Sequence, residues 1–121
     1  MRGIWLTVGE WKDLAAQARY NARNLARLCR LSARQLQRQF RVHFGRSPQD
    51  WLDEQRIAAA AQLLLSGEPV KKVAFDLGFK QPSHFCRQFK SRHKMTPSEF
   101  VLFHMQSMNT RRSQIINVAN G

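Results

Sequence analysis

Apolar positions between residues 21 and 44 recur at spacings of three and four, which is typical of amphipathic helices. Asn21 has the side chain of a helix N-cap and predicts a first short helix that runs to Cys29. Ser32 predicts the cap of a second helix, which continues to about Phe44 and ends at the following glycine. The apolar side of this second helix carries Leu36, Phe40, His43 and Phe44, and its polar side carries Arg34, Gln37, Arg38 and Arg41.

The second half of the chain repeats this pattern at a shift of 49 positions, so that Arg38 matches Arg87. Upstream of the second helix the shift is 48, which places one extra residue between the two helices of the second copy. Repetition of a unit of this size indicates a duplicated supersecondary element. The second copy is therefore predicted as a helix over residues 69–77, a turn at Gly78, and a helix that starts at Pro82.

A longer helix is predicted between the two copies. Ser47 and Pro48 form a helix start signal, and apolar residues at helical spacing continue to about Leu65. Thr96 and Pro97 repeat this signal before a last short helix. The sequence thus predicts an all-α fold of about seven helices, in which a long linker helix joins two helix-turn-helix subdomains. The expected boundaries are 8–46 for the first subdomain, 47–66 for the linker helix, 67–103 for the second subdomain and 104–121 for a flexible tail.

The chain carries 20 lysine and arginine residues against 8 aspartate and glutamate residues, which is a formal net charge of +12 at pH 7. Residues 14–49 contain eight arginines and no acid, and residues 71–94 form a second basic stretch. Such a charge requires a partner of opposite sign, which is nucleic acid, an anionic membrane surface or an acidic protein. Basic outer sides on both second helices are typical of helix-turn-helix units, whose second helix enters the major groove of DNA.

The sequence offers little support for other functional classes. No apolar run approaches the roughly 18 residues of a membrane span, and the N-terminal apolar stretch is too short for a signal peptide. Cys29 and Cys86 do not form a disulfide framework, so we expect a reduced, cytoplasmic protein. The cysteines and histidines lack the spacing of a metal site, and no catalytic constellation is present. We therefore expect no enzyme activity, no metal and no other cofactor.

The second helices, over about 33–44 and 82–93, are the predicted recognition helices. Arginine pairs with guanine and glutamine pairs with adenine in the major groove, whereas phosphate contacts set the register without reading sequence. The candidates for reading bases are Arg34, Gln35, Gln37, Arg38, Ser83, His84, Cys86 and Arg87. The candidates for holding phosphates are Arg30, Ser32, Arg41, Arg46, Lys80, Gln81, Lys90 and Lys94.

Three alternatives stay open at this point. Arg38 and Arg87 occupy equivalent positions, so both can instead have a structural role, such as pairing with an acid of the linker. The whole basic surface can serve a non-specific or architectural nucleic-acid-binding protein. A membrane-surface protein is a third reading, which the use of the phenylalanines and leucines in two cores disfavours. Gln35 and Gln37 favour sequence-specific binding, because amides add base contacts without phosphate charge.

These features together resemble the DNA-binding domain of the AraC/XylS family of bacterial transcription regulators. The resemblance covers about residues 8–103 and is most specific in the second unit. It rests there on Gly78, Phe79, Ser83, Phe85, Arg87, Phe89, Lys90, Thr96 and Pro97. In the linker and the first unit it rests on Leu25, Ala26, Leu31, Ser32, Leu36, Arg38, Phe40, Gly45, Pro48, Trp51, Leu52, Arg56, Ile57, Ala60, Leu63 and Leu64, with Trp11 as the aromatic residue of the first helix. Arg30 and Lys94 depart from the family, because they stand where it usually has glycine.

The resemblance implies an activator or repressor that binds double-stranded promoter DNA at an asymmetric site as a monomer. It also implies contact with RNA polymerase and unequal contributions from the two motifs. We expect the first motif to read more of the sequence, because the second presents Ser83, His84 and Cys86 in place of longer polar side chains. The chain is then either a short stand-alone regulator or one domain of a longer protein.

Overall fold

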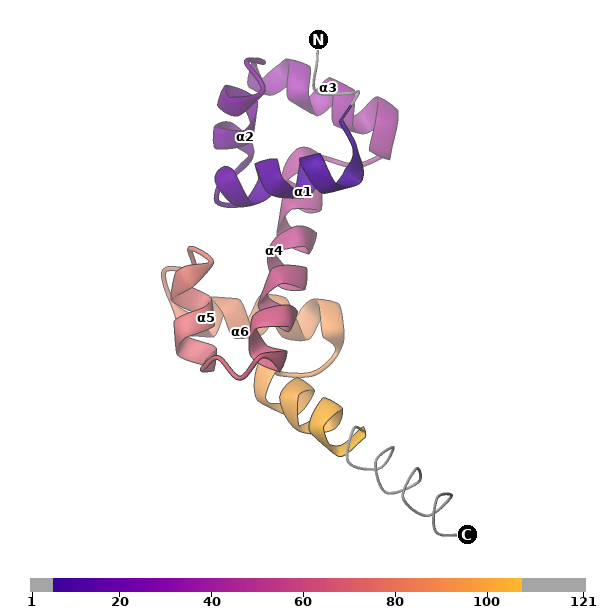
Figure 1. Ribbon diagram of the computed structural model, residues 1–121. Helices are drawn as coiled ribbons and strands as arrows, with labels where there is room; N and C mark the ends of the chain where they lie inside the picture. Colours follow the sequence, from indigo (N-terminus) through magenta and orange to yellow (C-terminus); the bar gives the residue numbers. More distant parts are fainter. Residues whose placement is uncertain (1–5, 108–121) are drawn as a thin grey trace, which may run out of the picture. The chain divides into compact units, whose positions relative to one another are not determined.

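The computed structural model describes residues 6–107, and this part of the chain is helical throughout, with no strand (Figure 1). In chain order, the helices are α1 (Val8–Gln17), α2 (Ala22–Leu28), α3 (Ala33–Phe44), α4 (Pro48–Leu65), α5 (Val70–Asp76) and α6 (Pro82–His93), followed by helical residues 97–107. The chain forms two compact units, which divide after Ala59, within α4. The predicted all-α fold, with a long helix joining two helix-turn-helix units, is confirmed.

Side-chain caps start the helices of the first unit. Asn21 accepts a hydrogen bond from the backbone amide three residues on, at 3.0 Å, and Ser32 does the same at 3.1 Å. These are the two N-caps that the sequence predicts. Thr7 starts α1 with a reciprocal capping box, a start that the hydrophobic pattern does not indicate.

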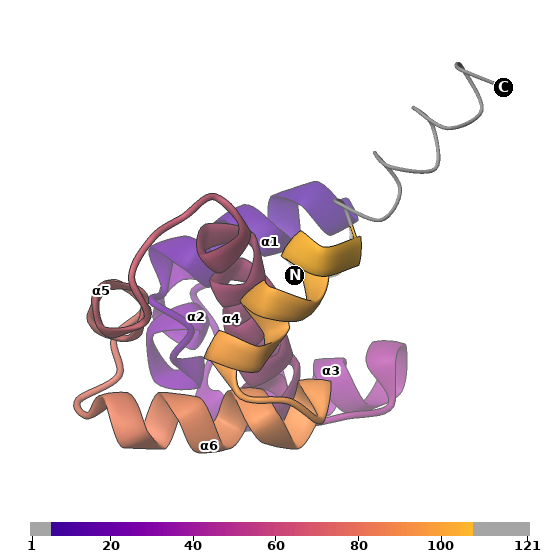
Figure 2. The same cartoon turned by 90° about the horizontal axis from the view of Figure 1, so that it is seen from below.

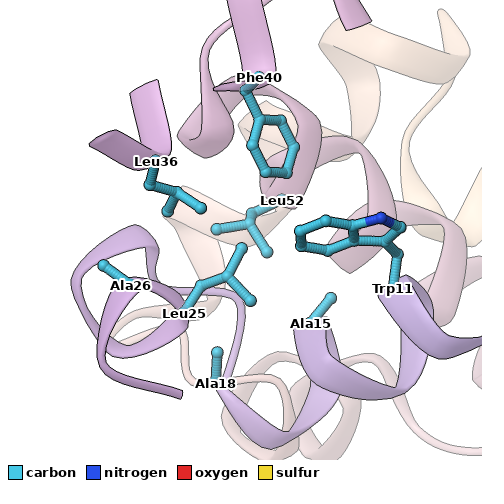
Figure 3. Packing of buried hydrophobic residues seen from close by; sticks show 8 residues of the cluster. All are labelled: Trp11, Ala15, Ala18, Leu25, Ala26, Leu36, Phe40 and Leu52. Carbon is cyan, nitrogen blue, oxygen red and sulfur yellow. The ribbon is translucent and has the colours of Figure 1, made fainter. Parts of the chain in front are cut away.

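The core of the first unit draws on all four of its helices (Figure 3). Trp11 of α1, Leu25 of α2, Phe40 of α3 and Leu52 of α4 are each at most 4% exposed. The rings of Trp11 and Phe40 meet edge to face, with their centroids 5.3 Å apart. In Figure 1, α1, α2 and α3 form three sides of a frame around this core.

Two residues of the predicted apolar side of α3 lie outside this core. His43 is exposed, and Phe44 is 44% exposed although its ring still contacts Trp11. Both belong to the last turn of α3, where the Phe44 ring contacts Trp11, Phe40 and Trp51 but stays partly exposed. The fully buried side of α3 is therefore formed by Leu36 and Phe40.

The second unit is built around phenylalanine rings from α6 and the following helix. Phe85 and Phe89 are fully buried, as their helical phase predicts. The centroid of the Phe89 ring lies 5.8 Å from that of Phe85 and 5.1 Å from that of Phe100. Val73 and Ala74 contribute the buried side of α5. Figure 2 shows α5 almost along its axis and α6 extended across the view, so the two helices of this motif cross.

Basic residues occupy left-handed backbone positions at the turns of both motifs. Arg30 has a φ of +57°, and Gly78, its equivalent in the second motif, has a φ of +86°. At the end of the second helix of each motif the glycine is in the first motif and the basic residue in the second, since Gly45 has a φ of +69° and Lys94 has a φ of +62°. The first turn therefore has the same left-handed geometry as its glycine counterpart. Arg30 and Lys94 carry the steric strain that glycine avoids.

Replacing Arg30 with glycine should stabilise the first unit. The left-handed conformation costs a side-chain-bearing residue about 1–2 kcal/mol, of which the greater chain entropy of glycine offsets about half. We expect a gain of about 0.5–1 kcal/mol in the free energy of unfolding, measured by urea titration with tryptophan fluorescence. Trp11 and Trp51 make this probe report on the first unit. The control Arg27→Gly, inside α2, should cost about 1 kcal/mol, and a loss of stability in both variants would contradict the strain.

His93 ends α6 and is half-buried against the aromatic core of the second unit. Its ring stacks on Phe89, with centroids 4.4 Å apart, and lies 5.0 Å from the ring of Phe100. Burial lowers the pKa of His93 below its ordinary value of 6.5, and the nearby His104 lowers it further. His104 belongs to the helix of residues 97–107, which continues past the predicted boundary at 103, while residues 108–121 of the predicted tail lie outside the described residues.

The second unit should lose stability in mild acid because of His93. Its folded-state pKa lies below the unfolded value, so the unfolded chain binds more protons once the pH falls below about 6.5. Phe44 occupies the equivalent position in the first unit, so His93→Phe is a natural replacement. We expect this variant to lose less stability than the unaltered chain between pH 7 and pH 5, in urea titrations followed by circular dichroism. Equal pH dependence of the two proteins would exclude His93 as the cause.

Candidate nucleic-acid interface

The outer side of α3 presents a continuous set of polar side chains to solvent. Arg34, Gln37, Arg38 and Arg41 are all exposed, while Leu36 and Phe40 anchor the opposite side of the same helix in the core. Because side chains three and four positions apart share one side of a helix, burial of the two apolar residues turns the four polar ones toward solvent. Three guanidinium groups and an amide on one helix side can contact both base edges and phosphates.

The outer side of α6 is smaller and partly engaged. Ser83, Arg87 and Lys90 are exposed, but Cys86 is half-buried. The ring of His84 packs edge to face against Phe79, with centroids 5.6 Å apart, and its Nε2 lies 3.3 Å from the Gln88 amide nitrogen. The second motif therefore offers fewer free long side chains than the first.

Two of the candidate residues hold the first turn of α3 together. The Ser32 amide donates to Gln35 Oε1 at 2.9 Å, and the Gln35 amide donates to Ser32 Oγ at 3.1 Å. From the sequence we expect Gln35 to read a base and Ser32 to bind a phosphate, and the sequence pattern does not predict this capping box. A base that contacts the Gln35 oxygen would have to use its second lone pair or displace the Ser32 amide.

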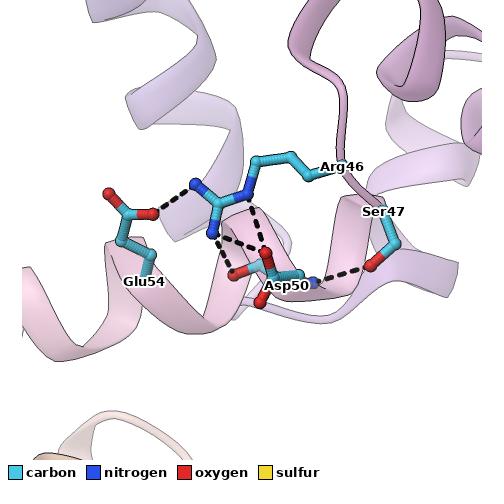
Figure 4. Close-up of polar contacts among 4 residues, drawn as sticks. All are labelled: Arg46, Ser47, Asp50 and Glu54. Carbon is cyan, nitrogen blue, oxygen red and sulfur yellow. Dashed lines mark hydrogen bonds and ion pairs between the residues drawn. The ribbon is translucent and has the colours of Figure 1, made fainter. Parts of the chain in front are cut away.

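Arg46 pairs with two acids of the linker helix (Figure 4). Its Nη2 lies 2.6 Å from Asp50 Oδ2, and its Nη1 forms a second ion pair with Glu54. The hydrogen bonds that Arg46 donates to Glu54 and to Asp50 raise the pKa of Arg46 above its ordinary range. The structural alternative raised for Arg38 and Arg87 is thus seen at a third arginine. Arg46, a candidate for phosphate binding, is already held by two carboxylates.

The remaining phosphate candidates are exposed. In the first unit they are Arg30 and Arg41, and in the second they are Lys80, Gln81, Lys90 and Lys94. Lys94 also donates from Nζ to the carbonyl oxygen of Ser91 at 3.0 Å. A neighbouring lysine, Lys72, forms ion pairs with Glu68 and Asp76 at 3.2 and 2.9 Å. In the second unit Lys72 of α5 is therefore neutralised by acids, whereas Lys80, Lys90 and Lys94 around α6 are exposed.

Gln49 joins the start of α4 to the turn between α1 and α2, and sequence patterns do not reveal this role. Its Oε1 accepts from the Ala22 amide at 3.0 Å. Its Nε2 donates to the carbonyl oxygen of Tyr20 at 3.1 Å and to Asp53 Oδ1 at 2.9 Å. Such a contact links residues almost thirty positions apart, so local periodicity carries no signal of it. Burial also raises the pKa of Tyr20 and lowers that of Arg56 in the same region.

The described residues contain no group of three metal-ligating side chains, and Cys29 and Cys86 are free thiols. Burial raises the pKa of Cys29, which favours its neutral thiol form. Within residues 6–107, no helix has the length and apolar character needed to cross a membrane.

Comparisons with known proteins agree on one kind of domain. Residues 25–101 match a family model described as a helix-turn-helix domain. A helix-turn-helix transcriptional regulator of Haemophilus influenzae, itself uncharacterized, is 33% identical over 82 residues, which are 67% of this chain and 28% of that protein. The virulence regulon transcriptional activator VirF of Yersinia enterocolitica is 38% identical over 61 residues, which are 50% of this chain and 22% of that protein. The chain thus spans only about a quarter of these relatives.

Two solved structures have the same fold. A DNA-binding transcriptional dual regulator of Escherichia coli K-12 superposes with a TM-score of 0.65 at 28% identity, over 71% of this chain and 78% of that one. An AraC-type regulator of Chromobacterium violaceum superposes with a TM-score of 0.64 at 24% identity, over 79% of this chain and 95% of that one. With the family model spanning more than half of its length, this chain belongs to the AraC/XylS family of transcription regulators and has the fold of that family's double helix-turn-helix DNA-binding domain.

Proposed function

We propose that this chain is a sequence-specific regulator of transcription that binds double-stranded promoter DNA. In this proposal α3 and α6 are the two recognition helices, which enter adjacent segments of the major groove. The observation that carries the proposal is the outer side of α3, where Arg34, Gln37, Arg38 and Arg41 are exposed opposite a buried apolar side. The family membership supports it.

The side-chain chemistry of α3 supports base reading rather than charge attraction alone. A guanidinium fork matches N7 and O6 of guanine, and a glutamine amide matches N6 and N7 of adenine. Gln37 adds no charge, so for attraction of phosphate alone it contributes less than a lysine or an arginine would. A surface for non-specific binding is better served by lysine and arginine throughout.

We propose that the two motifs contribute unequally. The α6 side offers Arg87 and Ser83, but His84 is packed on Phe79 and Cys86 is half-buried. The first motif should therefore supply most of the sequence discrimination. Binding by a single copy of the chain and contact with RNA polymerase remain further proposals from the family resemblance.

A second candidate function is non-specific or architectural binding of nucleic acid. The exposed Lys80, Lys90 and Lys94 favour it, because lysine contacts phosphate as a point charge without reading bases. Both functions use the same basic surface, and they differ in whether the DNA sequence changes the affinity.

Selection from a random double-stranded DNA library at near-physiological salt separates the two. Under the proposal, the enriched pool contains a site with two blocks about one helical turn apart, or about 34 Å. Enrichment of a single block would restrict base reading to one motif, which we expect to be the first. DNA binding without any enrichment would contradict sequence-specific regulation by this chain and support the architectural function.

Arg38→Ala should relax sequence preference as well as weaken binding. Loss of a bidentate contact to guanine costs about 1–3 kcal/mol at the site that it reads. Competition between the selected duplex and single-base variants measures this loss position by position. The control Lys90→Ala should weaken binding to all sequences alike and reduce the salt slope by about one unit. If Arg38→Ala behaves like the control, Arg38 is a phosphate contact.

Arg46→Ala should change DNA affinity less than Arg41→Ala does. Both residues are candidates for phosphate contact, but two carboxylates already hold the Arg46 guanidinium, whereas Arg41 is exposed on the outer side of α3. Fluorescence anisotropy over a range of salt concentrations should give a slope about 0.9 shallower for Arg41→Ala and nearly unchanged for Arg46→Ala. Equal reductions would mean that Arg46 leaves its ion pairs when DNA binds.

A further inference from the structure

The first unit contains a pocket next to the recognition helix. It has a volume of about 540 Å³ and is lined by the start of α2, the first two turns of α3 and the start of α4. Arg23 of α2 and Gln37 of α3 lie on its wall, together with Ser47. All of these segments belong to one compact unit, so the pocket does not depend on the second unit.

The charge that lines this pocket is positive. Arg23 is the one charged residue among the described residues that line it, and it is exposed. Asn21 and Gln49 also line it, but their side chains are occupied, Asn21 in capping α2 and Gln49 in bridging Ala22 and Tyr20.

The remaining lining groups are available to a ligand. The side chains of Arg23 and Gln37 have no hydrogen-bond or ion-pair partner within the part of the chain that the structure describes. The Ser47 oxygen accepts from the Asp50 amide at 3.2 Å, which leaves its hydroxyl proton to donate. A guanidinium, an amide and a hydroxyl are all hydrogen-bond donors, and together they match the oxygens of a phosphate group.

The second unit lacks this combination of side chains. At the equivalent positions Gln37 is replaced by Cys86 and Arg23 by Lys71. Pro69 replaces Asn21 and Ser98 replaces Gln49, so the second unit cannot form the bridge that shapes the wall. This set of pocket-lining side chains therefore belongs to the first motif and is not a general consequence of the repeated fold.

We propose that this pocket binds a phosphodiester group, with Arg23 as its principal charge and Gln37 and Ser47 as further donors. This inference rests on the proposed function, because Gln37 belongs both to the pocket and to the outer side of α3. A backbone phosphate in the pocket then lies beside the bases that α3 reads. Such a contact sets the position of α3 along the groove and makes the first unit the anchor on DNA.

The test compares Arg23→Gln with Arg27→Gln in the full chain. Arg27 lies one turn further along α2 and is exposed, but it does not line the pocket. We expect Arg23→Gln to make the salt slope of DNA binding shallower by about 0.9, and Arg27→Gln to leave it nearly unchanged. Equal reductions in both variants would indicate a diffuse basic surface and overturn the proposal. Matching urea midpoints establish that neither variant is misfolded.

A second measurement identifies the phosphate. Each linkage near the block read by α3 is replaced in turn with an uncharged methylphosphonate, and affinity is measured for the unaltered chain and for Arg23→Gln. The proposal requires that one linkage couples to Arg23, so that its replacement weakens the unaltered chain and not the variant. Coupling at no linkage would exclude a DNA phosphate.

Titration of the chain with inorganic phosphate distinguishes a free anion from the DNA backbone. Amide shifts of residues 21–23 and 37 that vanish in Arg23→Gln, without coupling to any linkage, would assign the pocket to a free phosphate. Absence of both responses would overturn phosphate binding altogether. The library selection tests the proposed function separately. If the chain selects a DNA site but Arg23→Gln behaves like Arg27→Gln, the pocket proposal fails and the proposed function stands.

Discussion

The burial of Phe40 between Trp11 and Trp51 is the contact on which the first unit depends. The centroid of its ring lies 5.3 Å from that of Trp11 and 5.6 Å from that of Trp51, so α1, α3 and α4 meet at one side chain. Removal of a buried phenylalanine ring costs about 3–5 kcal/mol, a large share of the stability of a small domain. Because Phe40 can only face inward, the arginines on the other side of α3 can only face solvent. The packing of the core therefore also determines which side of α3 is exposed.

The two motifs share a backbone plan and differ in how polar side chains reinforce it. Each motif has a left-handed residue in the turn before its second helix and another at the end of that helix. Arg30 and Gly45 fill these positions in the first motif, and Gly78 and Lys94 fill them in the second. The first unit adds the ion pairs of Arg46 and the hydrogen bonds of Gln49. At the equivalent positions the second unit has Met95 and Ser98, so neither interaction can be repeated there.

Neutralisation of selected cations shapes the surface charge. The net charge of +12 is not spread evenly, because acids pair with Arg46, just before α4, and with Lys72 on α5. These exposed pairs are worth little in stability, about 0–1 kcal/mol each. Their larger consequence is to neutralise Arg46 and Lys72, whereas Arg34, Arg38 and Arg41 stay exposed on the outer side of α3.

The sequence by itself determined the helices, the duplication and the orientation of each amphipathic side. Caps such as Asn21 and Ser32 act within three residues, and the burial of Leu36, Phe40, Phe85 and Phe89 follows from helical period alone. The tertiary structure decided which polar residues are already engaged. Gln49 and the pocket beside Arg23 depend on segments brought together by folding, whereas Arg46 pairs with acids only four and eight residues further along the chain. Periodicity describes one helix at a time, whereas a hydrogen bond between distant residues depends on where two helices are placed by the packing of their apolar sides.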